Sequence, residues 1–172
     1  MQIPMRPANA HNYSSRRGCK IDTIIVHTTQ SNAASAVHWF ADPDAMASAH
    51  YVVGADGTIT QCVPEEYAAW HAGNGAINRR SIGIECEGDC DRAETWTPAL
   101  TASLCWLMRD LATRYNIIVD RDHVMGHEDV PDPRDITKKG GAHHHRDPGK
   151  WFPWTLVMTA MQNAVKGVEI NG

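Results

Sequence analysis

Two periodicities of hydrophobic residues divide this chain, and the first predicts a β-sheet. Residues 20–27 contain a nearly continuous Ile-Ile-Val run, which is typical of a strand covered on both faces. Residues 48–53 and 58–63 flank a Gly-Ala-Asp-Gly turn, so we expect them to pair as a hairpin. Residues 1–19 show neither periodicity and are rich in Pro, Asn, Ser and Arg, which predicts an irregular lead-in.

A further strand is predicted over residues 80–88, where polar and apolar positions alternate. Glu85 falls on the same face as Ser81 and Gly83, opposite two isoleucines. A carboxylate inside a strand is costly to bury without a partner. We therefore expect Glu85 either to face solvent or to be held at a functional site.

The second periodicity predicts three helices, the first over residues 33–40. Thr97 can cap a helix that begins at Pro98 and ends at Asn116. Its apolar stripe is typical of core packing and consists of Leu100, Leu104, Leu107, Leu111 and Tyr115, widened by Trp106 and Met108. A last helix is predicted over residues 153–166. Its expected buried face comprises Leu156, Val157, Ala160, Met161, Ala164 and Val165.

The length of 172 residues predicts a single domain over residues 1–172, with a core from about 20 to 166, because no repeat or linker divides the chain. The apolar fraction of 42% suits a soluble globular protein, and no stretch approaches the ~20 apolar residues of a membrane span. The first 20 residues contain no apolar run, so no secretory signal is expected.

Charge and cysteine content exclude further classes. The net charge is −4 with both signs mixed along the chain, which gives no support to nucleic-acid binding. An odd number of irregularly spaced cysteines without a CxxC pair makes a poor disulfide framework and disfavours a zinc-thiolate site. We therefore expect synthesis in a reducing compartment. The cysteines are Cys19, Cys62, Cys86, Cys90 and Cys105.

The most concentrated candidate for chemistry is residues 143–149, which read His-His-His-Arg-Asp-Pro-Gly. Imidazole and carboxylate are common zinc ligands, and a Pro-Gly turn can hold them in place. The alternative is an accidental histidine-rich loop. A purification tag is disfavoured because the run is internal and only three residues long.

Other candidates follow predicted strands. His27 stands at the carboxyl end of the first strand, the edge where sites form in sheets flanked by helices, although a lone histidine there is more often structural. His127 follows a second short apolar run. Residues 70–75 form a Gly-containing loop that carries Trp70 and His71. Such loops often line sites, and a tryptophan packed beneath a turn is the alternative.

Six ordered motifs together resemble the zinc-dependent N-acetylmuramoyl-L-alanine amidases of the type-2 amidase family, which includes peptidoglycan-recycling amidases, phage endolysins and peptidoglycan recognition proteins. The resemblance extends from about Lys20 to Trp154. Each motif alone is weak, but all six in this order make a chance match very improbable. The motifs are Ile24-Ile25-Val26-His27-Thr28-Thr29, Ser48-Ala49-His50-Tyr51-Val52-Val53 with Asp56-Gly57, Ala69-Trp70-His71-Ala72-Gly73, Ser81-Ile82-Gly83-Ile84-Glu85, Gly126-His127-Glu128-Asp129-Val130, and Asp147-Pro148-Gly149 with Phe152-Pro153-Trp154.

The resemblance implies an α/β fold with a mixed central β-sheet flanked by helices on both faces. It places the metal ligands on His27, His127 and Asp147, and two imidazoles with one carboxylate and an open fourth position make a catalytic zinc site. Glu85 matches the family's acidic catalytic residue. His145 stands where many relatives have lysine, and its implied role is to stabilise the developing oxyanion.

Neighbouring histidines leave the choice of the third ligand open. We expect Asp147, because Pro148 restricts its backbone, whereas the run of histidines follows two flexible glycines. If the chain is extended here, His143 shares the inward-facing parity and is the competitor, while His144 and Arg146 face away.

The implied reaction is hydrolysis of the amide that joins the lactyl group of N-acetylmuramic acid to L-alanine in peptidoglycan. Trp70, His71 and Asn74 are candidates for lining the substrate groove, on loop position alone. A peptidoglycan-binding module without catalysis is one alternative, disfavoured because all three ligands and Glu85 are present. A zinc hydrolase such as a deaminase is another, disfavoured by the absence of a His-x-Glu with Pro-Cys-x-x-Cys pattern.

The expected setting is a phage or prophage endolysin, with a cytoplasmic recycling amidase as the alternative. Such a lysin is synthesised in the cytoplasm without a signal peptide and reaches the wall through a membrane lesion made by another protein. The expected partner is peptidoglycan, with no nucleic acid and no membrane insertion, and the expected state is a monomer.

Overall fold

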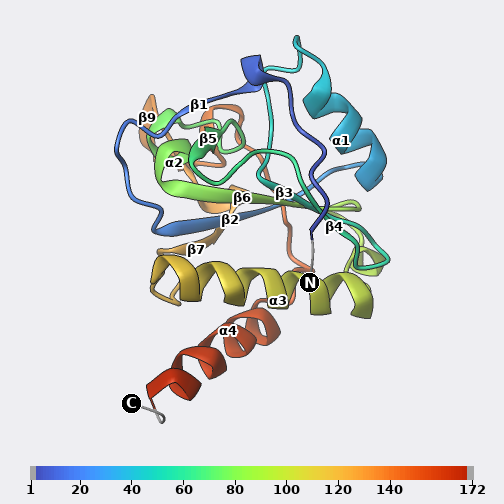
Figure 1. The fold of residues 1–172 in the computed structure, drawn as a ribbon, viewed down its shortest axis with the longest axis vertical. Helices are drawn as coiled ribbons and strands as arrows, with labels where there is room; N and C mark the ends of the chain where they lie inside the picture. The colour runs from blue at the N-terminus through green and yellow to red at the C-terminus, as the bar shows by residue number, and fades with distance from the viewer. Residues whose placement is uncertain (1–2, 170–172) are drawn as a thin grey trace.

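A five-stranded mixed sheet forms the centre of the protein. The computed structural model describes residues 3–169, with only the backbone described for 163–169. The strand order is β4-β3-β6-β2-β7, in which β4 is the antiparallel edge strand and the other four run parallel (Figure 1). The strands are β2 (Thr23–Thr28), β3 (Tyr51–Val53), β4 (Ile59–Gln61), β6 (Ser81–Cys86) and β7 (Val124–Gly126).

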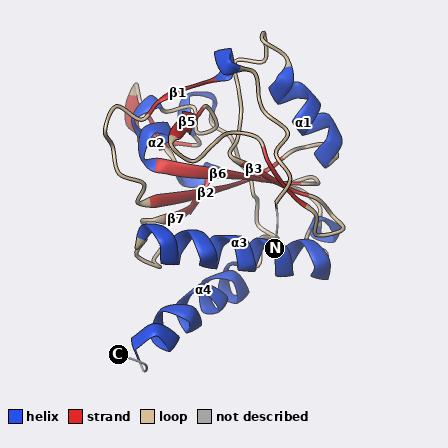
Figure 2. Ribbon diagram, viewed as in Figure 1, coloured by secondary structure: helices blue, strands red, loops and turns tan. Residues whose placement is uncertain are grey.

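Helices cover both faces of this sheet, as Figure 2 shows. The long helix α3 lies along one face, and α4 packs against α3 on the side away from the strands (Figure 1). The opposite face carries α1, α2 and the loops between them. The α/β fold with a mixed, doubly covered sheet is therefore confirmed. The helices are α1 (Ala33–Ala41), α2 (Gly75–Arg80), α3 (Pro98–Tyr115) and α4 (Trp154–Glu169).

Helix α3 forms where its capping residues and apolar stripe predict it. The Thr97 hydroxyl accepts a hydrogen bond from the Leu100 amide at 3.1 Å, and Pro98 occupies the first turn. Asn116 ends the helix in the left-handed conformation. The four predicted leucines are buried against the sheet, so the stripe is confirmed as core packing.

Strand β2 shows how the sheet separates a core face from a site face. All six of its residues are buried, which confirms the strand covered on both faces. Ile24 and Val26 face the α3 side, whereas Ile25 packs with Ala72 and Val130 on the other side. Because side chains alternate along a strand, His27 points to the same side as Ile25, away from α3.

Part of the lead-in departs from the prediction of an irregular segment. Strand β1 (Tyr13–Ser15) pairs antiparallel with β5 (Tyr67–Ala69). Arg16 is buried, and its guanidinium donates to the carbonyl oxygens of Glu65, Arg79 and Ser81 at 2.7, 2.9 and 3.0 Å. These are contacts to distant backbone, which local hydrophobic periodicity does not report. The boundaries of the single domain stay a prediction.

Two segments outside the predicted helices and strands also contain regular structure. The loop after residue 70 continues into α2, so the following strand begins at Ser81. The segment 131–142 holds a small hairpin of β8 (Pro131–Asp132) and β9 (Asp135–Lys139). Strand β9 is mostly exposed and lacks the alternation of a half-buried strand, which is why its pattern resembles that of a loop.

The buried face of α4 is narrower than predicted. Val157 and Met161 are buried in the core, but Leu156 is 55% exposed, so its predicted burial is wrong. Beyond its first residue the described part of this helix packs mainly against α3, and one neighbouring helix covers a narrower stripe than a sheet would. The predicted burial of Ala164 and Val165 concerns side chains outside the described residues.

All five cysteines lie within the described residues and are free, in agreement with the poor disulfide framework of the sequence. Among the described helices, none has the length and apolar character needed to cross a bilayer.

Candidate active site

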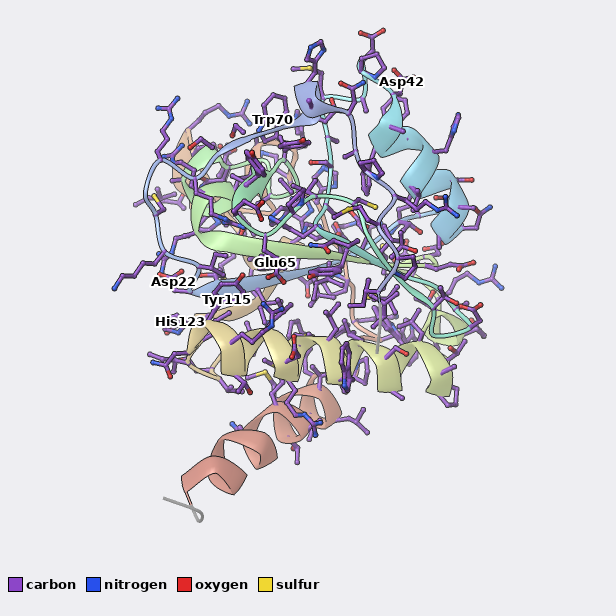
Figure 3. All side chains as sticks on the ribbon, viewed as in Figure 1. Asp22, Asp42, Glu65, Trp70, Tyr115 and His123 are labelled. Atoms are coloured by element: carbon purple, nitrogen blue, oxygen red, sulfur yellow. The ribbon has the colours of Figure 1, made fainter. Side chains whose placement is uncertain are left out.

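The candidate site lies at the carboxyl ends of three adjacent parallel strands. His27 near the end of β2 is in register with Glu85 on β6, and His127 follows Gly126, the last residue of β7. This edge is where open α/β sheets bind ligands. All three side chains line a cleft of about 850 Å³ on the face of the sheet opposite α3. Trp70, labelled in Figure 3, also lines this cleft and lies above the sheet in that view.

Close packing brings the distant Asp147 to the same edge. Its backbone carbonyl accepts a hydrogen bond from the Glu128 amide at 2.8 Å. Pro148 packs against Gly126, where an added Cβ would lie 2.5 Å from the proline Cδ. Gly149 has φ +83°, and a Cβ there would meet the Cys90 carbonyl. The segment is therefore held at the end of β7 with the Asp147 side chain turned inward and buried.

Three donor atoms converge in this buried cluster. The Nδ1 atoms of His27 and His127 lie 3.0 Å apart. The Asp147 carboxylate lies 3.2 Å from Nδ1 of His27 through Oδ2 and 3.3 Å from Nδ1 of His127 through Oδ1. Ligand atoms of a tetrahedral zinc site with bonds of about 2.0–2.2 Å stand roughly 3.3–3.6 Å apart, close to this spacing. The chemistry and geometry of the set fit a metal ion with a fourth position left open.

The protonation states of the cluster also suit a metal ligand set. Burial opposes ionisation of Asp147, but the adjacent His127 and His27 rings outweigh it and hold the pKa of that carboxyl well below its usual range. Burial, with the nearby His27 ring, lowers the pKa of His127. At neutral pH the carboxylate is charged and His127 is neutral, as metal coordination requires.

Glu85 faces the cleft rather than open solvent. Its Oε2 atom is shielded from solvent and has no hydrogen-bond partner among the described residues. Burial, together with the Asp147 charge, raises the pKa of Glu85 to about 8. A carboxyl group with a pKa near neutrality can both accept and release a proton. Of the two sequence alternatives for Glu85, a position on open solvent does not match the structure, and its functional role stays a prediction.

His145 lies beside the donor cluster without joining it. Its ring stacks on that of His127, with centroids 4.3 Å apart and an angle of 14° between the planes. Its Nδ1 lies 3.8 Å from Oδ1 of Asp147. Half of the side chain is exposed at the cleft, so one side of the ring is open to a substrate.

The other loop residues separate into inward and outward positions. His143 lines the cleft but is not among the three converging donors. His144 turns away, with Nδ1 lying 3.2 Å from the Lys139 carbonyl, and Arg146 contacts Asp91. The expected extended chain is wrong here, because residues Gly141–His143 form a 3-10 helix and His144 adopts a left-handed conformation.

The three predicted groove residues all line the cleft but differ in what they contact. The Asn74 side chain caps α2 by accepting hydrogen bonds from two amides, and its Nδ2 donates to the Pro131 carbonyl at 3.0 Å. His71 is buried directly behind His27. Trp70 is partly exposed, and its Nε1 donates to the Ser14 hydroxyl at 3.2 Å. Their contact with substrate stays a prediction.

Two exposed apolar residues on the cleft were missed by the sequence analysis. Trp39 and Met46 are 51% and 68% exposed, and both line the cleft. The signal for Trp39 was present in its helix, because it lies outside the stripe formed by the buried Ala36 and Phe40. Met46 follows a Pro-containing turn and carried no comparable signal.

Comparisons with known proteins agree with this geometry. The family described as N-acetylmuramoyl-L-alanine amidase matches residues 17–150. N-acetylmuramoyl-L-alanine amidase A from Achromobacter lyticus is 33% identical over 162 residues, which cover 87% of each chain. The chain spans 33% of the length of the amidase XlyA from Bacillus subtilis and 51% of AmiD from Escherichia coli, two further curated relatives.

Solved structures show the same fold. A mutant endolysin from Bacillus subtilis superposes with a TM-score of 0.70 at 26% identity, covering 94% of this chain and 99% of that one. AmiD from Escherichia coli, in complex with the substrate anhydro-N-acetylmuramic acid-L-Ala-D-gamma-Glu-L-Lys, superposes with a TM-score of 0.65 at 28% identity, covering 81% and 57%. The family match and the similarity to amidase A both extend over most of the chain, and the donor cluster at the carboxyl ends of the strands agrees with them. This chain therefore belongs to the N-acetylmuramoyl-L-alanine amidase family.

Proposed function

We propose that this chain is a zinc-dependent hydrolase that cleaves the amide bond between N-acetylmuramic acid and L-alanine in cell-wall peptidoglycan. The observation that carries the proposal is the convergence of the His27, His127 and Asp147 donors beside the shielded Glu85 oxygen in one cleft. A zinc ion held by these donors would polarise the scissile carbonyl and make a water molecule acidic enough to lose a proton near neutral pH.

Glu85 is the general base in this proposal. It accepts the proton of the attacking water and passes it to the leaving amine nitrogen, which departs as a neutral amine. Its raised pKa reflects burial beside the Asp147 charge. Glu85 would be ionised more readily with a cation held by His27, His127 and Asp147, because the cation would offset that charge, and its carboxylate would then be available as a base near neutrality.

His145 stabilises the negative charge that develops on the carbonyl oxygen. Burial and the nearby His127 ring lower the pKa of His145, so it is neutral at pH 7 and still carries one N–H donor. The stack on His127 limits rotation of the ring at the edge of the donor cluster. A donor that is already oriented needs little reorganisation during the reaction.

The cleft is large enough for a sugar with an attached peptide, since pockets for ligands of that size span about 300–1,000 Å³. The substrate named for the AmiD complex is a muramyl peptide of this kind. The exposed Trp39 and the partly exposed Trp70 present apolar surfaces on the cleft that suit stacking against a sugar ring. We propose that peptidoglycan of the cell wall is the substrate.

Digestion of purified peptidoglycan, followed by mass spectrometry of the fragments, tests this function. The expected products carry new N-terminal L-alanine and no new reducing sugar ends. Chelation followed by dialysis is expected to stop the reaction, and added zinc to restore it. New reducing ends would indicate a glycosidase, and unchanged peptidoglycan a binding module. Full activity in a verified metal-free sample would refute the metal-dependent mechanism.

The oxyanion function of His145 gives a second expected result. Replacement by alanine removes an N–H donor from the cleft, so we expect turnover to fall by about 10²-fold or more while zinc content is kept. Lysine at this position retains a donor, so His145→Lys is expected to keep much of the activity. Kinetic assays with metal analysis of both variants make the measurement. Loss of zinc in both would instead identify His145 as a ligand.

A further inference from the structure

His71 lies behind a metal ligand rather than in front of it. Its Nδ1 is 3.0 Å from Nε2 of His27, and its Nε2 is 3.1 Å from the hydroxyl of Ser81. We propose that His71 and Ser81 set the tautomer of His27, so that His27 presents an unprotonated Nδ1 to the metal. This inference rests on the proposed metal site and makes His71 a positioning residue instead of a substrate contact.

The contact between Ser81 and Ile77 determines which group donates in the hydrogen bond between His71 and Ser81. The Ser81 hydroxyl lies 2.8 Å from the backbone carbonyl of Ile77, which can only accept. Ser81 has one hydroxyl proton and donates it there. Its oxygen must therefore accept from Nε2–H of His71.

The burial of His71 determines which ring donates in the hydrogen bond between His27 and His71. His71 is buried, and none of the described carboxylates lies within hydrogen-bonding distance of its ring, so a positive charge on it would be uncompensated. A neutral ring with its proton on Nε2 leaves Nδ1 as an acceptor. His27 then donates from Nε2–H, and its own Nδ1 carries the lone pair on the side of the donor cluster, where a metal ion would bind.

The surrounding backbone holds His71 in this position. The Asn78 side-chain oxygen accepts hydrogen bonds from the amides of His71 and Ala72 at 3.3 and 2.8 Å. The His71 ring packs directly against strand β6 at Gly83, where an added Cβ would stand 2.4 Å from the His71 Cγ. Glycine at this position therefore makes room for the ring directly beneath the ligand.

This arrangement has a measurable consequence for metal affinity. An imidazole ligand usually donates its second N–H to an outer partner, and removal of that partner typically lowers metal affinity by about 10- to 100-fold. Without His71, His27 can place its proton on Nδ1 and must give it up before it binds the metal. The neutral His71 acceptor also adds no charge, so Asp147 remains the only anionic ligand.

The test compares two substitutions in the intact protein. His71→Leu fills the space but removes the acceptor, and we expect zinc affinity to fall by about 10- to 100-fold in a chelator competition. In His71→Asn the side-chain oxygen stands close to the original Nδ1 position, and we expect it to restore most of the affinity. An unchanged zinc affinity in His71→Leu would overturn the proposal.

A second measurement reads the tautomer directly. Long-range nitrogen–proton NMR correlations in the metal-free wild-type protein are expected to show His27 with its proton on Nε2, and a mixture of tautomers in His71→Leu. A wild-type His27 protonated on Nδ1 would overturn the proposal, even if the leucine variant fails to fold. Both readouts are independent of hydrolysis, so failure of the amidase assay alone leaves this inference separately testable.

Discussion

Asp147→Ala is expected to remove both bound zinc and peptidoglycan hydrolysis. The carboxylate is the one acidic member of the converging donors, and its loss leaves two neutral imidazoles to hold a divalent cation. Catalytic zinc sites typically use three protein ligands, so we expect zinc content to fall from about one per chain to near zero after dialysis. Elemental analysis and the muropeptide assay on the same sample make the measurement.

His143→Ala is the matched control for this substitution. His143 lies on the same loop, lines the same cleft and was the competing ligand on sequence grounds, but its ring is outside the converging donor set. We expect this variant to retain zinc and most of its activity. The reverse outcome, with metal lost from His143→Ala and kept in Asp147→Ala, would show that the third ligand is the histidine.

Glu85→Gln is expected to reduce turnover by about 10²-fold or more while leaving zinc affinity and fold intact. The amide keeps the size of the side chain but cannot accept the water proton. Steady-state kinetics should show the loss in kcat with KM little changed, because Glu85 acts on the proton and not on substrate binding. A variant within twofold of wild type would remove Glu85 from the mechanism.

The pH profile and a neighbouring glutamate sharpen this experiment. Glu85 must be ionised to act, and burial raises its pKa, so the wild-type rate should rise as pH increases through that pKa. This acid limb should disappear in Glu85→Gln. Glu87→Gln is the control, because Glu87 lies two residues further along the chain and accepts a hydrogen bond from the Ala55 amide instead of lining the catalytic cleft. It should keep both the rate and the profile.

Elements with strong local signals could be predicted from sequence, and elements formed by distant contacts could not. The Ile-Ile-Val run of β2 and the capped leucine stripe of α3 contain their own patterning. Strand β1 reads Tyr-Ser-Ser, and β9 reads Asp-Ile-Thr-Lys-Lys, so neither shows a sustained apolar face. Each forms because another segment supplies its hydrogen bonds, and sequence periodicity does not encode that partner.

The candidate site shows the same division. Motif order pointed to His27, His127 and Asp147, and the parallel order of β2 and β7 brings the two histidines together across 100 positions of sequence. Their roles as ligands stay a prediction. The position of His71 behind His27 was missed, because a histidine in a loop gives no indication of which ring nitrogen faces which neighbour. That information depends on Ser81, on the adjacent strand.

The buried guanidinium of Arg16 bears on where this catalytic unit can be cut and joined to other modules. It donates hydrogen bonds to the carbonyls of Arg79 and Ser81, at the junction of α2 and β6. The side chain of the neighbouring Asn78 accepts a hydrogen bond from the backbone amide of His71. The family match begins at residue 17, one position later. A chimaera joined at that boundary would discard Arg16 and strand β1, and with them hydrogen bonds at the junction of α2 and β6, next to the His71 that lies behind His27. Residues 4–12 add contacts of their own, including the buried Asn12 amide that donates to the Phe40 and Asp42 carbonyls, so a junction placed before these residues should transfer the hydrolytic unit with its supports.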